Sequence, residues 1–510
     1  MALNRRTLLG GGAVLGFPCL PALAQPARPN LILFFPDEMR ADALACYGNP
    51  VVKTPNFDRL AREGARFENC HVQYPVCGAS RCSLLTGWPT SVRGHRTLTY
   101  FLRPHEPNMF RYLREAGYDV FWFGKNDALA SATFKDSVTE WAQANQIADI
   151  LAQDTPDGPF TMLVKGGMDR RKTADYAMLQ RAIAILERGE NTRPFCIFLP
   201  LSQPHPPYGA PADFNTMYKP ADLPPLVPPG LAKKPVFYSD IRKAYGLDQV
   251  SDAQLRQVRA TYYGQVSYSD WLLGELLEAL ERTGHAQDTA IVTSSDHGDY
   301  AGDYGLVEKW PSGLESCLTH VPLIARVPGG TAGVTSHPMV ELYDIMATFL
   351  ELAGTQARHT HFARSLLPQI HGGPGDPLRA SFSEGGSNVY DAEKLRLGGL
   401  YGPKSALLND RPETASRCAS IKTGRYTYIA RPGGQNELYD RSTDPWEEHN
   451  LIDDRSIAAT RAELQQRLIN WYINTSGVPE HDGDPRDLPQ FNPPSNLQIP
   501  PEVRTRILDL

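Results

Sequence analysis

Four apolar runs constrain the fold of this chain more than any other feature. They span residues 30–36, 118–123, 195–199 and 289–294, and each is followed by polar or charged residues. Continuous apolar runs of this length are typical of strands buried on both faces of a parallel sheet. Helical patterns separate most of these runs, and such alternation predicts an α/β fold with a parallel sheet between helix layers.

The polar residues that follow these runs are expected to meet at one edge of the sheet. Ligands of open α/β sheets bind outside the carboxyl ends of the strands, so residues far apart in sequence can converge there. The residues expected at this edge are Asp37, Glu38, Lys125, His205, Asp296 and His297. Two adjacent acids such as Asp37 and Glu38 are costly at the end of a buried strand unless they bind a cation. A solvated loop or a helix cap is the alternative.

The stretch 75–87 predicts a strand or loop that runs into a helix beginning at Cys77. Arg81 would lie one turn into this helix, and Gly87 would end it. A helix N-terminus favours anions and lowers the pKa of a thiol placed there, and an arginine fork suits a tetrahedral oxyanion. The stretch therefore predicts an anion site with a reactive thiol. The alternative is a buried structural cysteine beside a helical arginine.

The same stretch resembles the signature of the sulfatase family, Cys-x-(Pro/Ala)-Ser-Arg-x-x-x-Leu-Thr-Gly. All the fixed positions match, with Ala79 at the position where most members have proline. In that family the cysteine is oxidised after translation to formylglycine, the catalytic nucleophile. The resemblance covers nearly the whole mature chain. It implies the alkaline-phosphatase-like fold, in which a large, mostly parallel or mixed sheet is sandwiched between helices.

The resemblance also implies a role for each motif. It implies that one divalent metal is held by Asp37, Glu38, Cys77, Asp296 and His297. It implies catalytic roles for Cys77, Arg81, Lys125, His205 and Lys309. Ca²⁺ is the expected ion, with Mg²⁺ and Mn²⁺ as alternatives because a histidine ligand is softer than oxygen. The chain departs from the family at Glu38, where Asp or Gln is usual, and at Asp127, where histidine is usual.

The activity that the resemblance implies is hydrolysis of an aryl or carbohydrate sulfate monoester to the alcohol and inorganic sulfate. The substrate would be a sulfated small molecule or glycan, and a formylglycine-generating enzyme would modify Cys77 during maturation. The nearest alternative is a phosphonate or phosphate diester hydrolase that shares the fold, metal site and formylglycine. An alternative of another class is an inactive relative that binds sulfated glycans.

Residues 1–24 are expected to form a twin-arginine signal peptide. Arg5 and Arg6 precede an apolar run over 8–17, and 22–24 offers a small-residue cleavage site. The protein is therefore expected in the periplasm or outside the cell. No later apolar run reaches membrane-spanning length, so no stable membrane insertion is expected. The net charge of −6 gives no support to nucleic-acid binding, for which a basic face would be needed.

A change of pattern near residue 378 predicts two domains. A catalytic domain is expected over 28–378, and a small α+β domain with an antiparallel sheet and a proline-rich tail over 379–510. The expected elements of the second domain are strands within 420–428 and 436–440 and a helix over 457–471.

Capping residues and apolar periodicity predict the main helices of the catalytic domain. The first is expected from Thr54, which would cap it, to Gly64. Three more are expected over 174–187, 252–282 and 340–353, and a strand is expected over 320–326. Of the eight cysteines, Cys19 lies in the signal peptide and seven remain. An odd number leaves at least one cysteine unpaired, and the spacing assigns no disulfide.

Overall fold

A computed structural model of the chain describes residues 28–143, 160–188, 192–387 and 401–478. In this part of the chain the larger of two sheets has nine strands. Their bounds are β1 Asn30–Asp37, β2 Ala65–His71, β3 Asp119–Phe123, β4 Glu140–Ala142, β5 Phe195–Pro204, β6 Thr289–Ser294, β7 His320–Val321, β8 Leu323–Arg326 and β9 Val334–Glu341. The strand order is β4-β3-β5-β1-β6-β8-β2-β7, and β9 pairs with β2.

Five neighbouring strands, from β4 to β6 in this order, are parallel. The four apolar runs of the sequence form β1, β3, β5 and β6, so their carboxyl ends lie side by side at one edge. Beyond β6 the sheet is mixed, because β8 is antiparallel to β6 and β2 is antiparallel to β8. The expected α/β fold with a large mixed sheet is confirmed.

The alternation of β1 builds a core on each face of the sheet. Ile32 and Phe34 pack into one apolar cluster, and Leu31, Leu33 and Phe35 pack into another. All five side chains are fully buried. Successive side chains of a strand point to opposite faces, so a strand covered on both faces is apolar along its length.

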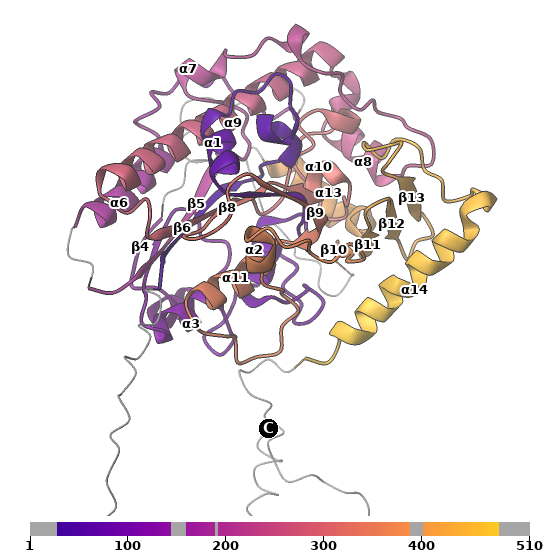
Figure 1. Cartoon of the computed structure of the whole chain (residues 1–510). Helices are drawn as coiled ribbons and strands as arrows, with labels where there is room; N and C mark the ends of the chain where they lie inside the picture. Colours follow the sequence, from indigo (N-terminus) through magenta and orange to yellow (C-terminus); the bar gives the residue numbers. More distant parts are fainter. Residues whose placement is uncertain (1–27, 144–159, 189–191, 388–400, 479–510) are drawn as a thin grey trace, which may run out of the picture.

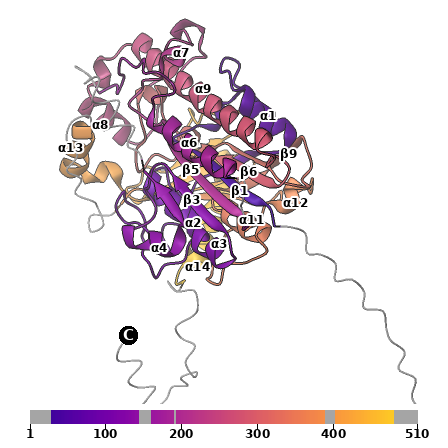
Figure 2. The same cartoon turned by 90° about the vertical axis from the view of Figure 1, so that its left-hand side faces the viewer.

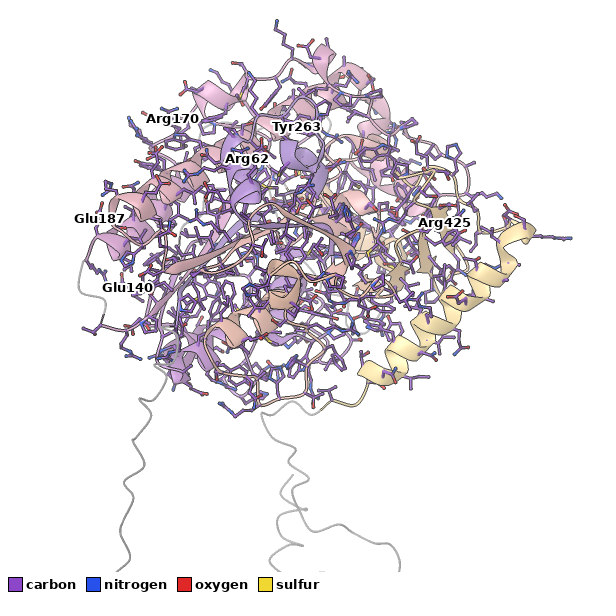
Figure 3. The ribbon with its side chains drawn as sticks, in the orientation of Figure 1. Arg62, Glu140, Arg170, Glu187, Tyr263 and Arg425 are labelled. Carbon is purple, nitrogen blue, oxygen red and sulfur yellow. The ribbon has the colours of Figure 1, made fainter. Side chains whose placement is uncertain are left out.

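Two groups of helices cover these faces, and Figure 1 shows them above and below the sheet. The upper group is α1 (Pro55–Glu63), α6 (Ala174–Glu187) and α9 (Asp252–Arg282). The lower group is α2 (Cys77–Thr86), α3 (Met109–Glu115) and α11 (Asp344–Leu352). Figure 3 labels Glu187, which ends α6 and pairs with Arg282 of α9 at 2.7 Å, so an ion pair joins the ends of two upper helices.

The second sheet has four antiparallel strands and lies beside the first in Figure 1. Its strands are β10 Ser381–Gly385, β11 Cys418–Lys422, β12 Tyr426–Ala430 and β13 Glu437–Asp440. Helix α14 (Ala458–Thr475) covers it, with Leu464, Leu468 and Trp471 in the shared core. The expected antiparallel sheet is therefore present. The proposed boundary of a small domain near residue 378 falls just before β10.

The described part of the chain has six further α-helices. They are α4 Phe134–Ser137, α7 Ala212–Asn215, α8 Phe237–Ala244, α10 Ser316–Thr319, α12 Leu367–Ile370 and α13 Gly402–Asp410. Figure 2 shows α8 and α13 side by side, and the structure has them in contact. No helix in the described ranges is long and apolar enough to cross a membrane. The expected signal peptide and most of the proline-rich tail lie outside these ranges.

Two expected elements differ from the structure. The helix expected over 340–353 begins only at Asp344, because residues up to Glu341 form β9 and pair in parallel with β2. The strand expected over 320–326 is divided into β7 and β8. The helices expected over 174–187 and 252–282 have the expected bounds.

The cap of α1 also differs from expectation. Thr54 precedes α1, but its hydroxyl accepts a hydrogen bond from Ala45 and does not cap the helix. The first-turn amides of Asn56 and Phe57 donate instead to Asp270 of α9, at 2.9 and 2.8 Å. Burial raises the pKa of Asp270 to about 7 although these donors oppose the shift. A carboxyl group from a neighbouring helix thus supplies the cap.

Replacement of Asp270 by Asn should change how stability depends on pH. The pKa of Asp270 is about 7 in the folded chain and near 4 in an unfolded chain. The contribution of this pKa difference to the free energy of unfolding is therefore complete below about pH 4 and is lost as the pH rises through 7. It amounts to at most roughly 4 kcal/mol. The stability advantage of the wild type over Asp270→Asn should shrink between about pH 4.5 and 7.5 in urea denaturation. A constant difference would contradict this prediction.

Candidate active site

The structure brings the nine sequence-predicted site residues together at the carboxyl edge of the parallel strands. Asp37 ends β1, and Glu38 follows it. Lys125 follows β3, His205 follows β5, and Asp296 and His297 follow β6. Cys77 and Arg81 lie in the first turns of α2, and Lys309 lies in the segment after β6. The six residues that follow or end these strands are therefore at the expected edge of the sheet.

Four of these residues form a compact group of possible metal ligands. Asp37, Cys77, Asp296 and His297 each offer one atom, and these atoms all lie within 4.8 Å of one another. The Sγ atom of Cys77 is 3.2 Å from Nε2 of His297 and 3.7 Å from Oδ1 of Asp37. All four side chains are buried. This group is the centre of the site.

Arg81 joins the two carboxylates of this group. Its Nη2 donates to Oδ2 of Asp37 at 2.7 Å, and its Nε donates to Oδ2 of Asp296 at 2.8 Å. Arg81 is fully buried. Burial raises the pKa of Asp37, but Lys125 and Arg81 outweigh that effect and hold this pKa well below its ordinary value. Asp37 is thus an anion available to a cation.

Glu38 belongs to a second group beside the first. Its Oε2 accepts from Nζ of Lys309 at 2.8 Å and lies 3.3 Å from Nε2 of His205. Its backbone has φ of +68°, and its amide donates to Oδ1 of Asp296 at 3.0 Å. Glu38 is therefore outside the four-residue group and forms a group with Asp37 and His205. Burial raises the pKa of Glu38 despite Lys309.

The residues present fit a divalent cation. Carboxylate oxygens with one imidazole suit Ca²⁺, Mg²⁺ or Mn²⁺, and Asp37, Asp296 and His297 provide this set. Oε1 of Glu38 is buried and has no hydrogen-bond partner in the described part of the chain. A buried polar oxygen without a partner is costly, and a nearby cation would remove that cost and favour the ionised carboxylate. The cluster can hold a metal; its identity does not follow from the ligands.

Two lysines flank Cys77. Nζ of Lys125 is 3.5 Å from Sγ of Cys77 and donates to Oδ2 of Asp37 at 2.7 Å. The same ammonium pairs with Asp127 at 3.0 Å, so the acid at the position where the family usually has histidine binds Lys125. Nζ of Lys309 lies 2.7 Å from Nε2 of His205.

The hydrogen bonds of His205 determine which of its nitrogens carries a proton. Nδ1 is 2.5 Å from the carbonyl oxygen of Pro206, which can only accept, so Nδ1 donates. Burial and the neighbouring Lys309 lower the pKa of His205 well below its ordinary value. In the neutral imidazole Nε2 is then an acceptor, and the ammonium of Lys309 donates to it.

The expected lowering of the Cys77 pKa is wrong for the unmodified thiol. Burial and the neighbouring Asp37 raise this pKa above its ordinary value, and Lys125 and Lys309 oppose them only in part. Cys77 does begin α2, but its side chain is buried, and burial disfavours the thiolate. A buried thiol with a raised pKa is a poor nucleophile.

Sequence reasoning missed Glu308 and Lys404. Oε1 of Glu308 lies 3.3 Å from Nζ of Lys309 and accepts from Nζ of Lys404 at 2.8 Å. Lys404 also donates to the backbone carbonyl of Lys309 at 3.3 Å. Glu308 directly precedes Lys309, a predicted site residue, and this position in the sequence could have indicated that it lies near the site. Lys404 lies in α13, beyond the larger sheet, and no local pattern connects it to the site.

Comparisons with known proteins agree with this geometry. The model of the family described as Sulfatase matches residues 29–355. The multifunctional alkaline phosphatase superfamily protein PehA of Trinickia caryophylli is 27% identical, over 88% of this chain and 96% of its own length. The arylsulfatase of Clostridium perfringens is 28% identical, over 87% and 94%.

The fold also matches solved structures. A phosphonate monoester hydrolase of Agrobacterium radiobacter superposes with a TM-score of 0.72 at 23% identity, and the match covers 88% of this chain and 96% of that chain. This likeness concerns the fold, whereas the family model identifies the family through more than half of the sequence. The chain therefore belongs to the sulfatase family, the sulfuric ester hydrolases of the alkaline-phosphatase-like superfamily.

Proposed function

We propose that this enzyme hydrolyses a sulfate monoester to an alcohol and inorganic sulfate, with position 77 as the nucleophile. One observation carries the proposal: Cys77 lies within a single buried cluster that contains two carboxylates, a histidine, Arg81 and the ammonium of Lys125. An anionic ester whose sulfur approaches position 77 would meet cationic donors on several sides. Such preorganised charge stabilises a developing oxyanion in a buried site.

The proposed nucleophile is the hydrate of formylglycine. A formylglycine-generating enzyme, supplied with an oxidant, would convert the CH₂–SH group of Cys77 to an aldehyde, and addition of water would give a geminal diol. The raised pKa of the thiol argues against direct attack by sulfur. The Sγ atom of the unmodified chain marks where the oxygens of the diol would lie, next to His297 and Lys125.

The proposed reaction has two steps. In the first, one diol oxygen bonds to sulfur, its proton passes to a neighbouring base, and the bond from sulfur to the alcohol oxygen breaks. That alcohol oxygen takes a proton from the Lys309–His205 pair, in which the hydrogen bonds leave the proton on Lys309. In the second, the remaining hydroxyl loses its proton, the aldehyde forms again, and the carbon–oxygen bond to sulfate breaks.

We further propose that Asp37, Asp296 and His297, with position 77 and the neighbouring Glu38, hold one divalent cation, expected to be Ca²⁺. When bound, the cation would supply Lewis-acid stabilisation and acidify a bound hydroxyl group. Arg81 keeps both carboxylates in place. Lys125 and Lys309 are then left to face the negative charge of the ester.

We also propose a location and a division into domains, both of which rest on the sequence. A twin-arginine signal over 1–24 would direct the folded enzyme to the periplasm or outside the cell. The catalytic domain is proposed to span 28–378 and a small C-terminal domain 379–510. The strand β10 begins at Ser381, which supports that boundary.

A phosphonate or phosphate diester hydrolase is the second candidate function. It is supported by the likeness in fold to the phosphonate monoester hydrolase of Agrobacterium radiobacter, at a TM-score of 0.72. A diester carries a single negative charge, as a sulfate monoester does, so the same cationic groups could bind either.

Rates on two substrates with the same leaving group test the proposed activity. We expect kcat/KM for 4-nitrophenyl sulfate to exceed that for phenyl 4-nitrophenyl phosphate by at least about tenfold, or about 1.4 kcal/mol. The reason is that a diester has a second organic group where sulfate has a free oxygen for Lys125 or Lys309. The opposite order would favour the second candidate.

Mass spectrometry of the chain from its native host tests the nucleophile. The peptide with position 77 should have one oxygen in place of sulfur and two hydrogens, whereas Cys82 in the same helix should retain its thiol and serves as the internal control. Cys77→Ala should lose at least about a thousandfold in kcat with an unchanged thermal midpoint. An intact thiol at position 77 in active enzyme would remove the proposed nucleophile.

Thermal unfolding with and without divalent cations tests the metal site. At a Ca²⁺ concentration of about 100 times Kd, the bound cation should add about 2.7 kcal/mol of stability. This gain should be largely lost in Asp296→Asn and retained in Asp270→Asn, a buried acid outside the cluster. Equal gains in both variants, or full activity after chelation, would contradict the proposed site.

A further inference from the structure

A cavity of about 270 Å³ opens above Cys77. Its polar end is formed by Cys77, Lys125, His205 and Lys309, which are residues of the proposed reaction centre. This volume lies just below the usual range for ligand pockets, about 300–1,000 Å³, and suits a compact ligand. The cavity is therefore positioned to receive the alcohol part of an ester whose sulfate lies at position 77.

Most of the surface that the cavity exposes is apolar, although Arg96, Thr97, Asp127, Ser387 and Lys404 also line it. One wall comes from the segments around α2 and includes Tyr74, Val76 and Leu98. The other comes from residues after β6 and after the larger sheet, and includes Pro311, Leu408 and Ala415. Tyr74 and Val76 are buried, and Leu98 and Leu408 are partly buried. These side chains offer contact area and almost no hydrogen-bonding groups.

The cations that line the cavity are mostly neutralised by acids. Lys125 pairs with Asp127 at 3.0 Å, and Lys404 pairs with Glu308 at 2.8 Å. Lys309 faces the reaction centre, where it pairs with Glu38. Lys125 and Lys309 thus mark the end of the cavity that suits the sulfate at position 77, and Arg96 is a further cation among the described residues that line it.

A small polar patch remains at one side. Oε2 of Glu308 and the hydroxyl of Tyr401 have no hydrogen-bond partner among the described residues, and both residues line the cavity. They can bind a water molecule or a single hydroxyl group. Tyr74 and Thr97 also line the cavity, but their hydroxyls already hydrogen-bond to the backbone of Gly386 and Tyr100. Few polar groups are thus left for the several hydroxyls of a sugar ring, each of which costs free energy if it is buried without a partner.

We propose that this cavity is the subsite for the alcohol part of the substrate and that it selects a compact, apolar alcohol over a sugar as that part. The inference rests on the proposed function, because it takes position 77 as the point of attack. Burial of apolar surface would be the source of selectivity, and each methylene that enters the cavity should raise kcat/KM by about fourfold.

A series of 4-alkylphenyl sulfates tests this inference. Phenyl, 4-methylphenyl, 4-ethylphenyl and 4-propylphenyl sulfate have leaving groups of nearly equal acidity, so differences in kcat/KM report binding in the cavity. We expect a rise of about fourfold per methylene until the cavity is full. We also expect 4-(hydroxymethyl)phenyl sulfate to be a poorer substrate than 4-ethylphenyl sulfate by at least about tenfold. Glucosamine 6-sulfate should likewise be poorer than cyclohexylmethyl sulfate, an apolar ester whose leaving group is also a primary alcohol, by at least about tenfold.

Matched variants locate the effect. In Leu98→Asn and Leu408→Asn, kcat/KM should increase less with alkyl length than in the wild type, while phenyl sulfate is still hydrolysed. The control is Leu378→Asn, because Leu378 is 83% exposed and outside the cavity lining; its rise should equal that of the wild type.

Two failures can be told apart. If the wild type hydrolyses phenyl sulfate but shows no rise with alkyl length, or prefers the sugar sulfate, the inference is wrong and the proposed function stands. If no sulfate ester is hydrolysed while phenyl 4-nitrophenyl phosphate is, the proposed function fails and the inference fails with it.

Discussion

The double ion pair of Arg81 is the interaction on which the rest of the site depends. Asp37 and Asp296 end or follow adjacent parallel strands, so their negative charges are brought close together by the sheet itself. Two buried carboxylates repel each other and are costly to desolvate. The guanidinium of Arg81, which donates to both, offsets this cost. Its position one turn into α2 also places Cys77 beside the two acids.

The charged groups of the site form two layers around Arg81 and its two aspartates. Nearest the sheet, two aspartates and His297 form the anionic group that suits a cation. Around it, Lys125 and Lys309 each pair with an inner acid and with a further acid, Asp127 or Glu308 respectively. Alternating charges of this kind keep buried ions paired. The same arrangement leaves cationic groups facing position 77.

Local patterns in the sequence were sufficient for the central strands and for the residues at their ends. Apolar runs precede Asp37, Lys125, His205 and Asp296, so strand prediction also predicted where these side chains converge. The strand β9 was missed because its pairing with β2 is long-range and its residues adjoin a helical pattern. A short apolar segment beside a helix does not reveal such a partner.

Three features of the site were beyond local reasoning. The side chain of Glu38 turns toward Lys309 because its backbone adopts positive φ, which a non-glycine residue seldom does. Lys404 reaches Glu308 from a helix almost a hundred positions away. The thiol pKa was mispredicted because a helix terminus is visible in sequence, whereas burial and the neighbouring Asp37 are not.

The burial of Cys77 has a consequence for the order of events in the life of the chain. Its side chain is 1% exposed in the first turn of a helix that is buried throughout. An enzyme that modifies Cys77 needs access to its side chain, which the folded protein buries. The proposed oxidation of Cys77 would therefore have to precede the docking of α2. Under that proposal each molecule would be committed to being active or inactive before it folds, and a chain that folded with its thiol intact would have no later route to the aldehyde.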